Sequence, residues 1–363
     1  MLAIQDIENL FRNSLSNETL SYSYLPINNN PSFLDYDNII AVMIIREDEN
    51  GKKVPIGYGV TQKITNNQYY VMMNVINGNY LNKYVSINDN QTYFKSFNHK
   101  NLSILSIDNI YNIFNNHNII KSPISTYLLP YNTVFGDSDV KSVMEILFDE
   151  TIKKFDINNN FYLNKNMTID FMYDSNKIGR EEELMVMNGI GFNVVDKMYF
   201  QKCTHTLESL KISTENVFNY IGECLVIGKD NLGMVIEYDN FVIGINRKDF
   251  LEHLFKLGNV NGLVQVDDKK DAIGYILIMN NHILGCYGDD KNIQMNLIKN
   301  ILPKLDDITD VTFFLNCTDD SLATKLLENA LEIKEIRRHH TLSIIEKINW
   351  NKIGIIGIGC HIF

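Results

Sequence analysis

Apolar residues alternate with short polar turns along the chain, and this pattern predicts its strands and helices. Apolar residues at three- and four-residue spacing predict an opening amphipathic helix over 4–15. Three strands joined by polar turns are expected over 38–46, 54–62 and 68–76. A polar region over 77–121 follows, which we expect to form an inserted hairpin and a short helix. Beyond it, the pattern predicts a strand over 124–129, a helix over 137–152, a strand over 168–173, a short helix over 181–187 and a strand over 197–202.

Three short motifs recur in the second half of the chain in the same order. The pairs are Ile56-Gly57-Tyr58 with Ile273-Gly274-Tyr275, Phe135-Gly136-Asp137 with Tyr287-Gly288-Asp289, and Met167–Phe171 with Val311–Leu315. The preserved order favours a duplication. Helices that alternate with partly antiparallel strands predict a mixed α/β (α+β) sheet in two lobes. We expect an N-terminal lobe over 1–205, with the inserted hairpin region at about 77–121, and a C-terminal lobe over 215–363.

A doubly wound parallel sheet is the alternative fold, and it needs a glycine-rich turn between an early strand and helix. The chain has no such turn in its first part. The run Gly354–Gly359 reads Gly-Ile-Ile-Gly-Ile-Gly, but only four residues follow it, which leaves no room for a dinucleotide-binding helix. We therefore interpret this run as a final apolar strand.

Composition and charge exclude several classes of function. Against 33 Lys and Arg the chain has 44 Asp and Glu, and its net charge of −11 disfavours binding to nucleic acid. The apolar run over 39–45 is far shorter than the roughly 20 residues of a membrane helix. The five cysteines form no CxxC pair, so neither a disulfide framework nor a metal site is expected. We expect an intracellular, cytoplasmic protein without a membrane span, and the oligomeric state stays open.

Two stretches resemble the GNAT superfamily of acyl-CoA-dependent N-acyltransferases, in the tandem type with two GNAT-like lobes in one chain. Asp239–Leu251 resembles the opening of the C-terminal lobe of that type, where a Gly, an Asp or Asn and an Arg precede an apolar helix. The other stretch runs from Ala272 to the helix at Ile293. Together with the first-lobe counterparts, the resemblance covers about 36–205 and 215–345.

The resemblance implies an acyl-CoA site. In this family two central strands open as a V whose main-chain groups bind the pantetheine arm, and the next helix presents its amides to the pyrophosphate. Carried onto this chain, Leu128 and Leu129 belong to the splayed strand, and Gly136 and Ser138 to the helix start. The implied co-substrate is acetyl-CoA or another acyl-CoA, with no metal.

The phosphate loop departs from the family pattern, which has a Gln or Arg followed by two spaced glycines. Here Gly136 stands alone between acidic neighbours, and Gly288 is followed by Asp289 and Asp290. A like charge at 4 Å costs about 4 kcal/mol at an effective dielectric of 20. The alternative role of these aspartates is helix capping. Ser138 can donate a hydrogen bond, which makes the first lobe the better candidate for acyl-CoA binding.

The resemblance also implies a mechanism, in which the acyl group passes directly to an amine within a ternary complex. An acid must protonate the departing thiolate, and Tyr173 lies near the family position for that acid; its alternative role is a solvated tyrosine at a strand end. The acceptor is then the amine of a small molecule or of a protein. The competing hypothesis is a catalytically silent GNAT-like binding or scaffold protein.

Overall fold

A computed structural model gives the fold and divides the chain into two compact units. Unit 1 comprises residues 1–171, 176–195 and 339–343, and unit 2 comprises 172–175, 196–338 and 344–363. The residues that the structure describes are 19–22, 36–47, 53–76, 83–86, 92–95, 102–106, 110–112, 140–143, 146–148, 150–151, 166–173, 187, 191–215, 222–305, 309–317, 320–342 and 348–356.

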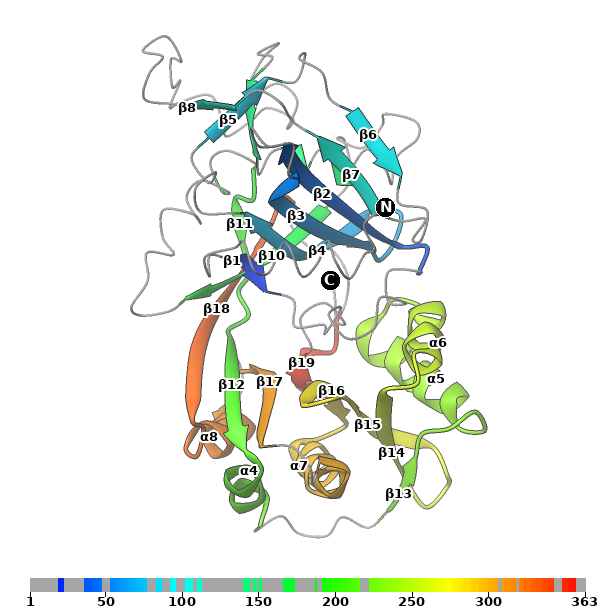
Figure 1. The fold of residues 1–363 in the computed structure, drawn as a ribbon. Coiled ribbons are helices and arrows are strands. Elements are labelled where there is room, and N and C mark those ends of the chain that lie inside the picture. The colour runs from blue at the N-terminus through cyan, green and yellow to red at the C-terminus, as the bar shows by residue number, and fades with distance from the viewer. Residues whose placement is uncertain are drawn as a thin grey trace. The chain divides into compact units, whose positions relative to one another are not determined.

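Unit 1 is built on a mixed sheet with the strand order β10-β4-β3-β2-β7-β6 (Figure 1). Its strands are β2 (Ile39–Glu47), β3 (Lys53–Lys63), β4 (Gln68–Ile76), β6 (Thr92–Lys95), β7 (Leu102–Ser106) and β10 (Asn166–Tyr173). β1 (Thr19–Tyr22) pairs with β4, and β11 (Val194–Val195) pairs with the end of a strand that arrives from unit 2. A second sheet has the order β8-β5-β9, formed by β8 (Ile110–Asn112), β5 (Lys83–Ser86) and β9 (Val140–Ser142).

The predicted elements of this unit are confirmed where they alternate regularly. The strands expected over 38–46, 54–62 and 68–76 are β2, β3 and β4, and the strand expected over 168–173 lies in β10. The helix expected over 137–152 is wrong at its start, because 140–142 pair with β5 as strand β9, and helical residues begin at Val143. The helix at 4–15, the strand at 124–129 and the helix at 181–187, apart from Met187, lie outside the described residues.

Unit 2 has one mixed sheet with the strand order β13-β14-β15-β16-β19-β17-β12-β18. The strands are β12 (Phe200–Thr206), β13 (Glu223–Val226), β14 (Val260–Val266), β15 (Ala272–Met279), β16 (His282–Gly288), β17 (Asp310–Asn316), β18 (Glu332–His340) and β19 (Ile353–Ile356). The helices are α4 (Leu207–Thr214), α5 (Leu232–Ile243), α6 (Lys248–Lys256), α7 (Lys291–Ile301) and α8 (Asp320–Leu327), with short 3-10 turns η6 (Leu302–Leu305) and η7 (Trp350–Lys352).

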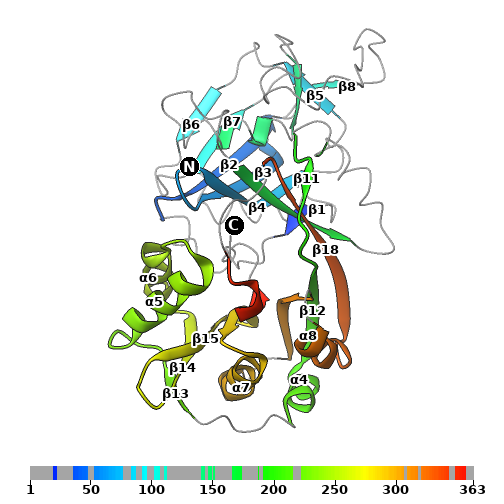
Figure 2. The same ribbon diagram turned by 180° about the vertical axis from the view of Figure 1, so that it is seen from behind.

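Helices cover both faces of the unit 2 sheet (Figures 1 and 2). Ile293 of α7 packs on Gly274, and Tyr238 of α5 stacks edge-on against Tyr275. Because neighbouring strand residues point to opposite faces, α7 and α5 lie on opposite sides of β15. The larger apolar core lies on the α7 side, with α4 and α8. The mixed α/β architecture expected from the sequence is confirmed.

Both units share the order strand, strand, strand, helix, strand, apart from strands β5 to β9, which unit 1 inserts between its third strand and its helix. β2, β3 and β4 form an antiparallel meander, as do β14, β15 and β16. The motif glycine lies under the following helix in both units: an added Cβ would lie 3.0 Å from Leu147 Cδ1 at Gly57 and 2.8 Å from Ile293 Cγ2 at Gly274. At Gly274 an added Cβ would also lie 2.7 Å from Tyr287 O, so glycine is required there, whereas at Gly57 a larger residue would make the Leu147 side chain shift. A duplication explains the shared order and stays our interpretation.

The units differ from the predicted lobes at three segments, of which the shortest, 172–175, lies in unit 2. Residues 196–205 lie in unit 2, because β12 pairs with β17 and β18 there. Residues 339–343 lie in unit 1, where His340 and His339 at the end of β18 pair with β11. Local patterning cannot reveal such long-range pairing.

Candidate functional site

Two parallel strands diverge in unit 1, and we call β4 with β10 the first fork. Three residue pairs join the strands at their starts, ending with Tyr70 opposite Thr168. Beyond that point 71–76 and 169–173 continue as strands but make no pair with each other. Beyond the base, the main-chain groups of each strand can therefore pair with an extended segment other than the opposite strand.

Polar side chains gather at the base of the first fork. The Tyr70 hydroxyl donates to Asp170 Oδ2 at 2.5 Å, and Gln68 Nε2 donates to Thr168 Oγ1 at 2.8 Å. Thr168 Oγ1 also lies 2.8 Å from His340 Nδ1. These side chains are at most 2% exposed. A buried phenol bonded to a carboxylate can hold and pass a proton at the point where the strands separate.

One wall of the first fork already has a partner. β1 runs antiparallel to β4, with Tyr22 opposite Met73, Ser21 opposite Asn74 and Thr19 opposite Val75. Among the described residues, β1 has no pair with β10. The segment therefore lies along β4 alone.

Unit 2 contains an equivalent second fork, formed by β16 and β17. A single parallel pair, His282 with Thr312, joins these strands. β19 lies between their later parts and pairs antiparallel with both of them (Figure 1). Each fork also has a bulge on its first strand, where Met72 is the extra residue of β4 and Leu284 that of β16.

The amides that open α7, beside the second fork, are occupied by the protein itself. The Asp290 carboxylate accepts from the main-chain N–H groups of Asn292 at 2.7 Å and Ile293 at 3.0 Å. The capping role is thus confirmed for Asp290. Asp289 instead accepts from the Tyr238 hydroxyl at 2.9 Å and forms an ion pair with Lys352 at 2.7 Å. Burial, and then the Asp289 charge, raise the pKa of Tyr238 above its usual value.

The stretch that carried the family resemblance in unit 2 forms a buried ion pair. Asp239 near the end of α5 pairs with Arg247, which precedes α6, and both are at most 5% exposed. The Tyr275 hydroxyl donates to the same carboxylate. Burial, and then the Asp239 charge, raise the pKa of Tyr275 well above its usual value. Gly244, with φ of 75°, ends α5 and reverses the chain between the pair. The cluster therefore holds α5 and α6 on β15.

The structure places the predicted site residues as follows. Tyr173 is the last residue of β10. Leu128, Leu129, Gly136 and Ser138 lie outside the described residues, so their assignment stays a prediction. The parallel partner of β10 is β4, a strand to which the sequence analysis gave no role in the site.

Sequence reasoning also missed Tyr70 and Asp170, which lie 100 positions apart. The only local signal was a polar Asp within an apolar strand, a residue type that is rarely buried without a partner.

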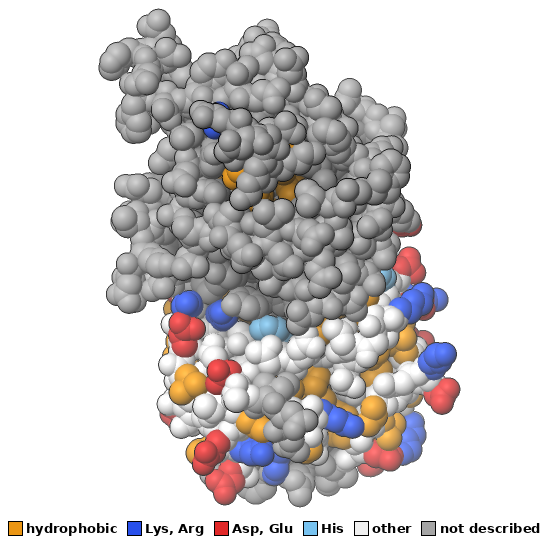
Figure 3. Space-filling model, in the orientation of Figure 1, with side chains coloured by type: hydrophobic (Ala, Val, Ile, Leu, Met, Phe, Trp, Pro, Cys, Tyr) orange, Lys and Arg blue, Asp and Glu red, His pale blue; other side chains and the backbone are white. Residues whose placement is uncertain are grey.

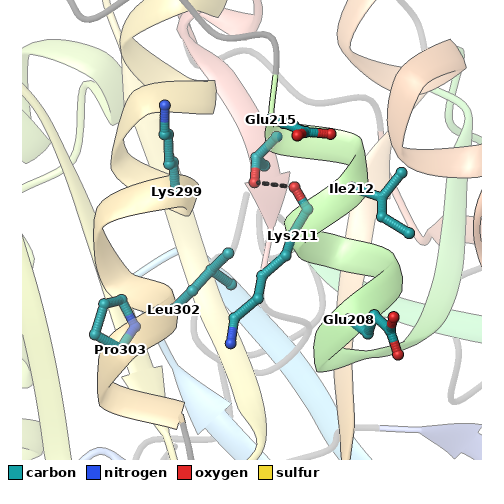
Figure 4. A pocket seen from close by; sticks show the side chains of 8 residues that line it. Glu208, Lys211, Ile212, Glu215, Lys299, Leu302 and Pro303 are labelled. Atoms are coloured by element: carbon teal, nitrogen blue, oxygen red, sulfur yellow. Dashed lines mark hydrogen bonds between the residues drawn. The ribbon is translucent and has the colours of Figure 1, made fainter.

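Other surfaces of the described part offer weaker chemistry. A hollow between α4 and the end of α7 with η6 has a volume of about 650 Å³ (Figure 4). Lys211 and Lys299 line it together with Glu208 and Glu215, so it favours neither sign of charge. The visible face of unit 2 mixes apolar and charged side chains (Figure 3). Among the described residues no cluster of metal-ligating side chains occurs, and no helix there has the length and apolar character needed to cross a bilayer.

Comparisons with known proteins give one family model and a set of similar folds. Residues 26–194 match a domain of unknown function (DUF7596), and no curated protein matches. A tandem GNAT protein from the clavulanic acid biosynthesis pathway has 6% identity and a TM-score of 0.43, over 82% of each chain. Tandem GNAT proteins are therefore among the solved structures that the chain resembles, as the sequence analysis expected.

Other GNAT-like structures resemble the chain over different shares of its length. The GCN5-related glucosamine N-acetyltransferase region of a fungal multi-domain GH3 β-N-acetylglucosaminidase has 9% identity and a TM-score of 0.44, over 81% of this chain and 32% of that one. A GCN5-related N-acetyltransferase from Anabaena variabilis has 12% identity and a TM-score of 0.32, over 54% of this chain and 50% of that one.

Proposed function

We propose that the protein is an acyl-CoA-dependent N-acyltransferase whose first fork binds the acyl-CoA. The observation that carries the proposal is the divergence of β4 and β10 beside the buried Tyr70–Asp170 pair. The facing edge of β10, and that of β4 once β1 is displaced, provide main-chain groups for a pantetheine arm, and the pair provides proton transfer at the same point. Gly136 and Ser138 remain our candidates for binding the pyrophosphate, although strand β9 separates them from the helix that begins at Val143.

In the proposed reaction, the acceptor nitrogen attacks the thioester carbonyl, so that a C–N bond forms and the C–S bond breaks. Asp170 takes the proton that the amine loses. Tyr70 gives its proton to the departing thiolate and regains one from Asp170, so both groups return to their starting state. Tyr173, farther along β10, is the alternative acid. Direct transfer of this kind needs no covalent enzyme intermediate.

The acceptor is proposed to be an amine of a small molecule or of a protein. The net charge of −11 attracts cationic amines over a range set by ionic strength. A cytoplasmic location, where acyl-CoA is available, belongs to the same proposal.

A silent GNAT-like scaffold is the second candidate function. It is favoured by a specific observation, because strands of the protein itself occupy β4 in the first fork and both walls of the second. Under the enzyme proposal, acyl-CoA displaces β1 from β4. Under the scaffold proposal, β1 stays in place.

Thermal unfolding with saturating acetyl-CoA separates the two proposals. At 100 times the dissociation constant, binding stabilises the native state by about 2.7 kcal/mol, which raises the melting temperature by about 5–10 °C. Ser21→Pro removes a main-chain donor of β1 and is expected to strengthen acetyl-CoA binding, whereas Ser21→Ala leaves the backbone intact. Gly136→Glu is expected to abolish the shift. If neither acetyl-CoA nor longer acyl-CoAs shift the melting temperature of the Ser21→Pro variant, the enzyme proposal is wrong.

A further inference from the structure

The later parts of β16 and β17 are separated by the last strand of the protein. Along β16, Ile356 lies opposite Gly285 and Ile355 opposite Cys286. Along β17, the same two isoleucines lie opposite Phe314 and Leu315. β19 is thus a central strand between β16 and β17, which pair with each other only at His282 and Thr312. It satisfies backbone groups on both walls of the second fork.

Hydrogen bonds hold the segment just before β19 in place. Asn349 N donates to Val242 O at 2.9 Å, and Asn349 Nδ2 donates to Phe241 O at 2.8 Å. On β17, Asn316 Nδ2 donates to Ile353 O at 3.0 Å. These bonds fix the register with which β19 enters.

The space around β19 also restricts which side chains this strand can carry. Ile353, Ile355 and Ile356 are at most 3% exposed. At Gly354 an added Cβ would overlap Gln294 Oε1 of α7 and lie 2.6 Å from Leu322 Cδ2 of α8. A larger residue at position 354 would therefore force the ends of the Gln294 and Leu322 side chains to move.

From these contacts we infer that the second fork is a strand-binding site, and that the protein fills it with its own residues 349–356. Recognition combines main-chain pairing on two walls with the limited space at position 354, which the Gln294 and Leu322 side chains bound. While β19 is bound, the fork is closed to every other extended ligand, including an acyl-CoA arm. When β19 leaves, the fork binds an apolar peptide with the same sequence. The inference goes beyond the proposed activity and does not depend on it.

Hydrogen–deuterium exchange on the full chain tests this inference. Gly354→Val is expected to displace β19 and to lower protection of 285–287 and 314–315 at least tenfold, while β13 and β14 keep theirs. Gly233→Val is the matched control, because an added Cβ at Gly233 has no atom within 4 Å. Asn316→Ala removes the donor to Ile353 O and to Trp350 O, and is expected to give the same pattern with a smaller loss.

A synthetic peptide of residues 349–363 provides the second measurement. Added to the Gly354→Val chain, it is expected to restore protection of 285–287 and 314–315, whereas a peptide that carries Gly354→Val does not. Unchanged protection in Gly354→Val overturns the inference. A uniform loss across unit 2 in both variants also overturns it, because β19 is then an inseparable part of the fold. Failure of the peptide to restore protection overturns it as well. None of these readouts requires acyltransfer activity, so the proposed function can fail independently.

Discussion

The two forks share a backbone plan and differ in what fills them. In both units an antiparallel meander precedes a helix and a parallel strand, with a bulge on the third strand of the meander. At the base, Tyr70 lies opposite Thr168 in unit 1 and His282 lies opposite Thr312 in unit 2. Two positions after these threonines, unit 1 has Asp170 and unit 2 has Phe314. The hydrogen-bonded Tyr70–Asp170 pair of the first fork therefore has no counterpart at the equivalent positions His282 and Phe314 of the second.

The strands that occupy the two forks also differ, in how many walls of the fork they pair with. β1 pairs with Met73–Val75 of β4, and β19 pairs with the equivalent positions 285–287 of β16. β19 also pairs with the opposite wall, whereas β1 has no pair with β10 among the described residues. A segment held on one edge loses fewer hydrogen bonds when it leaves. We infer that the first fork is suited to ligand exchange and the second to structural support.

The largest expected effect concerns the chemistry of the first fork. Tyr70→Phe is expected to lower the rate of acyl transfer by about 10²–10⁴-fold, because the phenolic proton is lost while the ring is kept. His282→Phe at the equivalent position of unit 2 is the control and should leave the rate unchanged. A steady-state assay of CoA release measures both variants. Equal rates for Tyr70→Phe and the parent protein would show that Tyr70 is not the acid.

Arg247→Met sharpens the comparison through the stability of unit 2. Removing the Arg247 guanidinium leaves the Asp239 carboxylate buried without a cation. We therefore expect a loss of about 3–5 kcal/mol in the free energy of unfolding. Lys248→Met is the matched control, because its ion pair with Glu252 is exposed and contributes at most about 0.5 kcal/mol. Urea unfolding gives both values. Acetyl-CoA binding by unit 1 should persist at low urea, and its loss there would argue against separate roles for the forks.

The base of the second fork is expected to make stability depend on pH. Burial, and then Lys202, lower the pKa of His282 to about 4. In the unfolded chain His282 is protonated below about pH 6.5, whereas in the folded protein it is protonated only below about pH 4. The free energy of unfolding therefore falls by up to about 1.4 kcal/mol per pH unit between about 6.5 and 4. His282→Gln should flatten this part of the stability profile, and an unchanged slope would assign it to other groups.

The smallest expected effect concerns the α7 cap. Asp290→Ala should cost about 1 kcal/mol of stability, because two main-chain amides lose their acceptor. Asp268→Ala in an exposed turn is the control and should change stability by less than about 0.5 kcal/mol. Isothermal titration should still detect no acetyl-CoA binding in the second fork of Asp290→Ala, because β19 remains there. Binding of a second equivalent would show that the carboxylate, not β19, closes this fork.

Strand positions were predictable from the sequence where strands alternate and turn locally, as β2, β3 and β4 do. Which strands pair with each other was less predictable. Pairing of β4 with β10 joins segments about 100 residues apart, and the parallel register cannot be read from either one alone. The sequence also predicted a final apolar strand, but its place between β16 and β17 depends on Gly354 meeting Gln294 and Leu322. The Tyr70–Asp170 pair arises from the same long-range register.

The path of β18 sets the order in which the protein can be completed during synthesis. Unit 1 takes most of its residues from 1–195 but also needs 339–343, where Thr341 N donates to Met167 O at 3.0 Å. A ribosome adds about 5–20 residues per second, so this last piece emerges roughly 7–30 s after residue 195. During that interval β10 lacks its hydrogen bonds to Thr341 and His340. The nascent first unit must therefore wait, with an incomplete sheet, for almost the whole of unit 2 to be made.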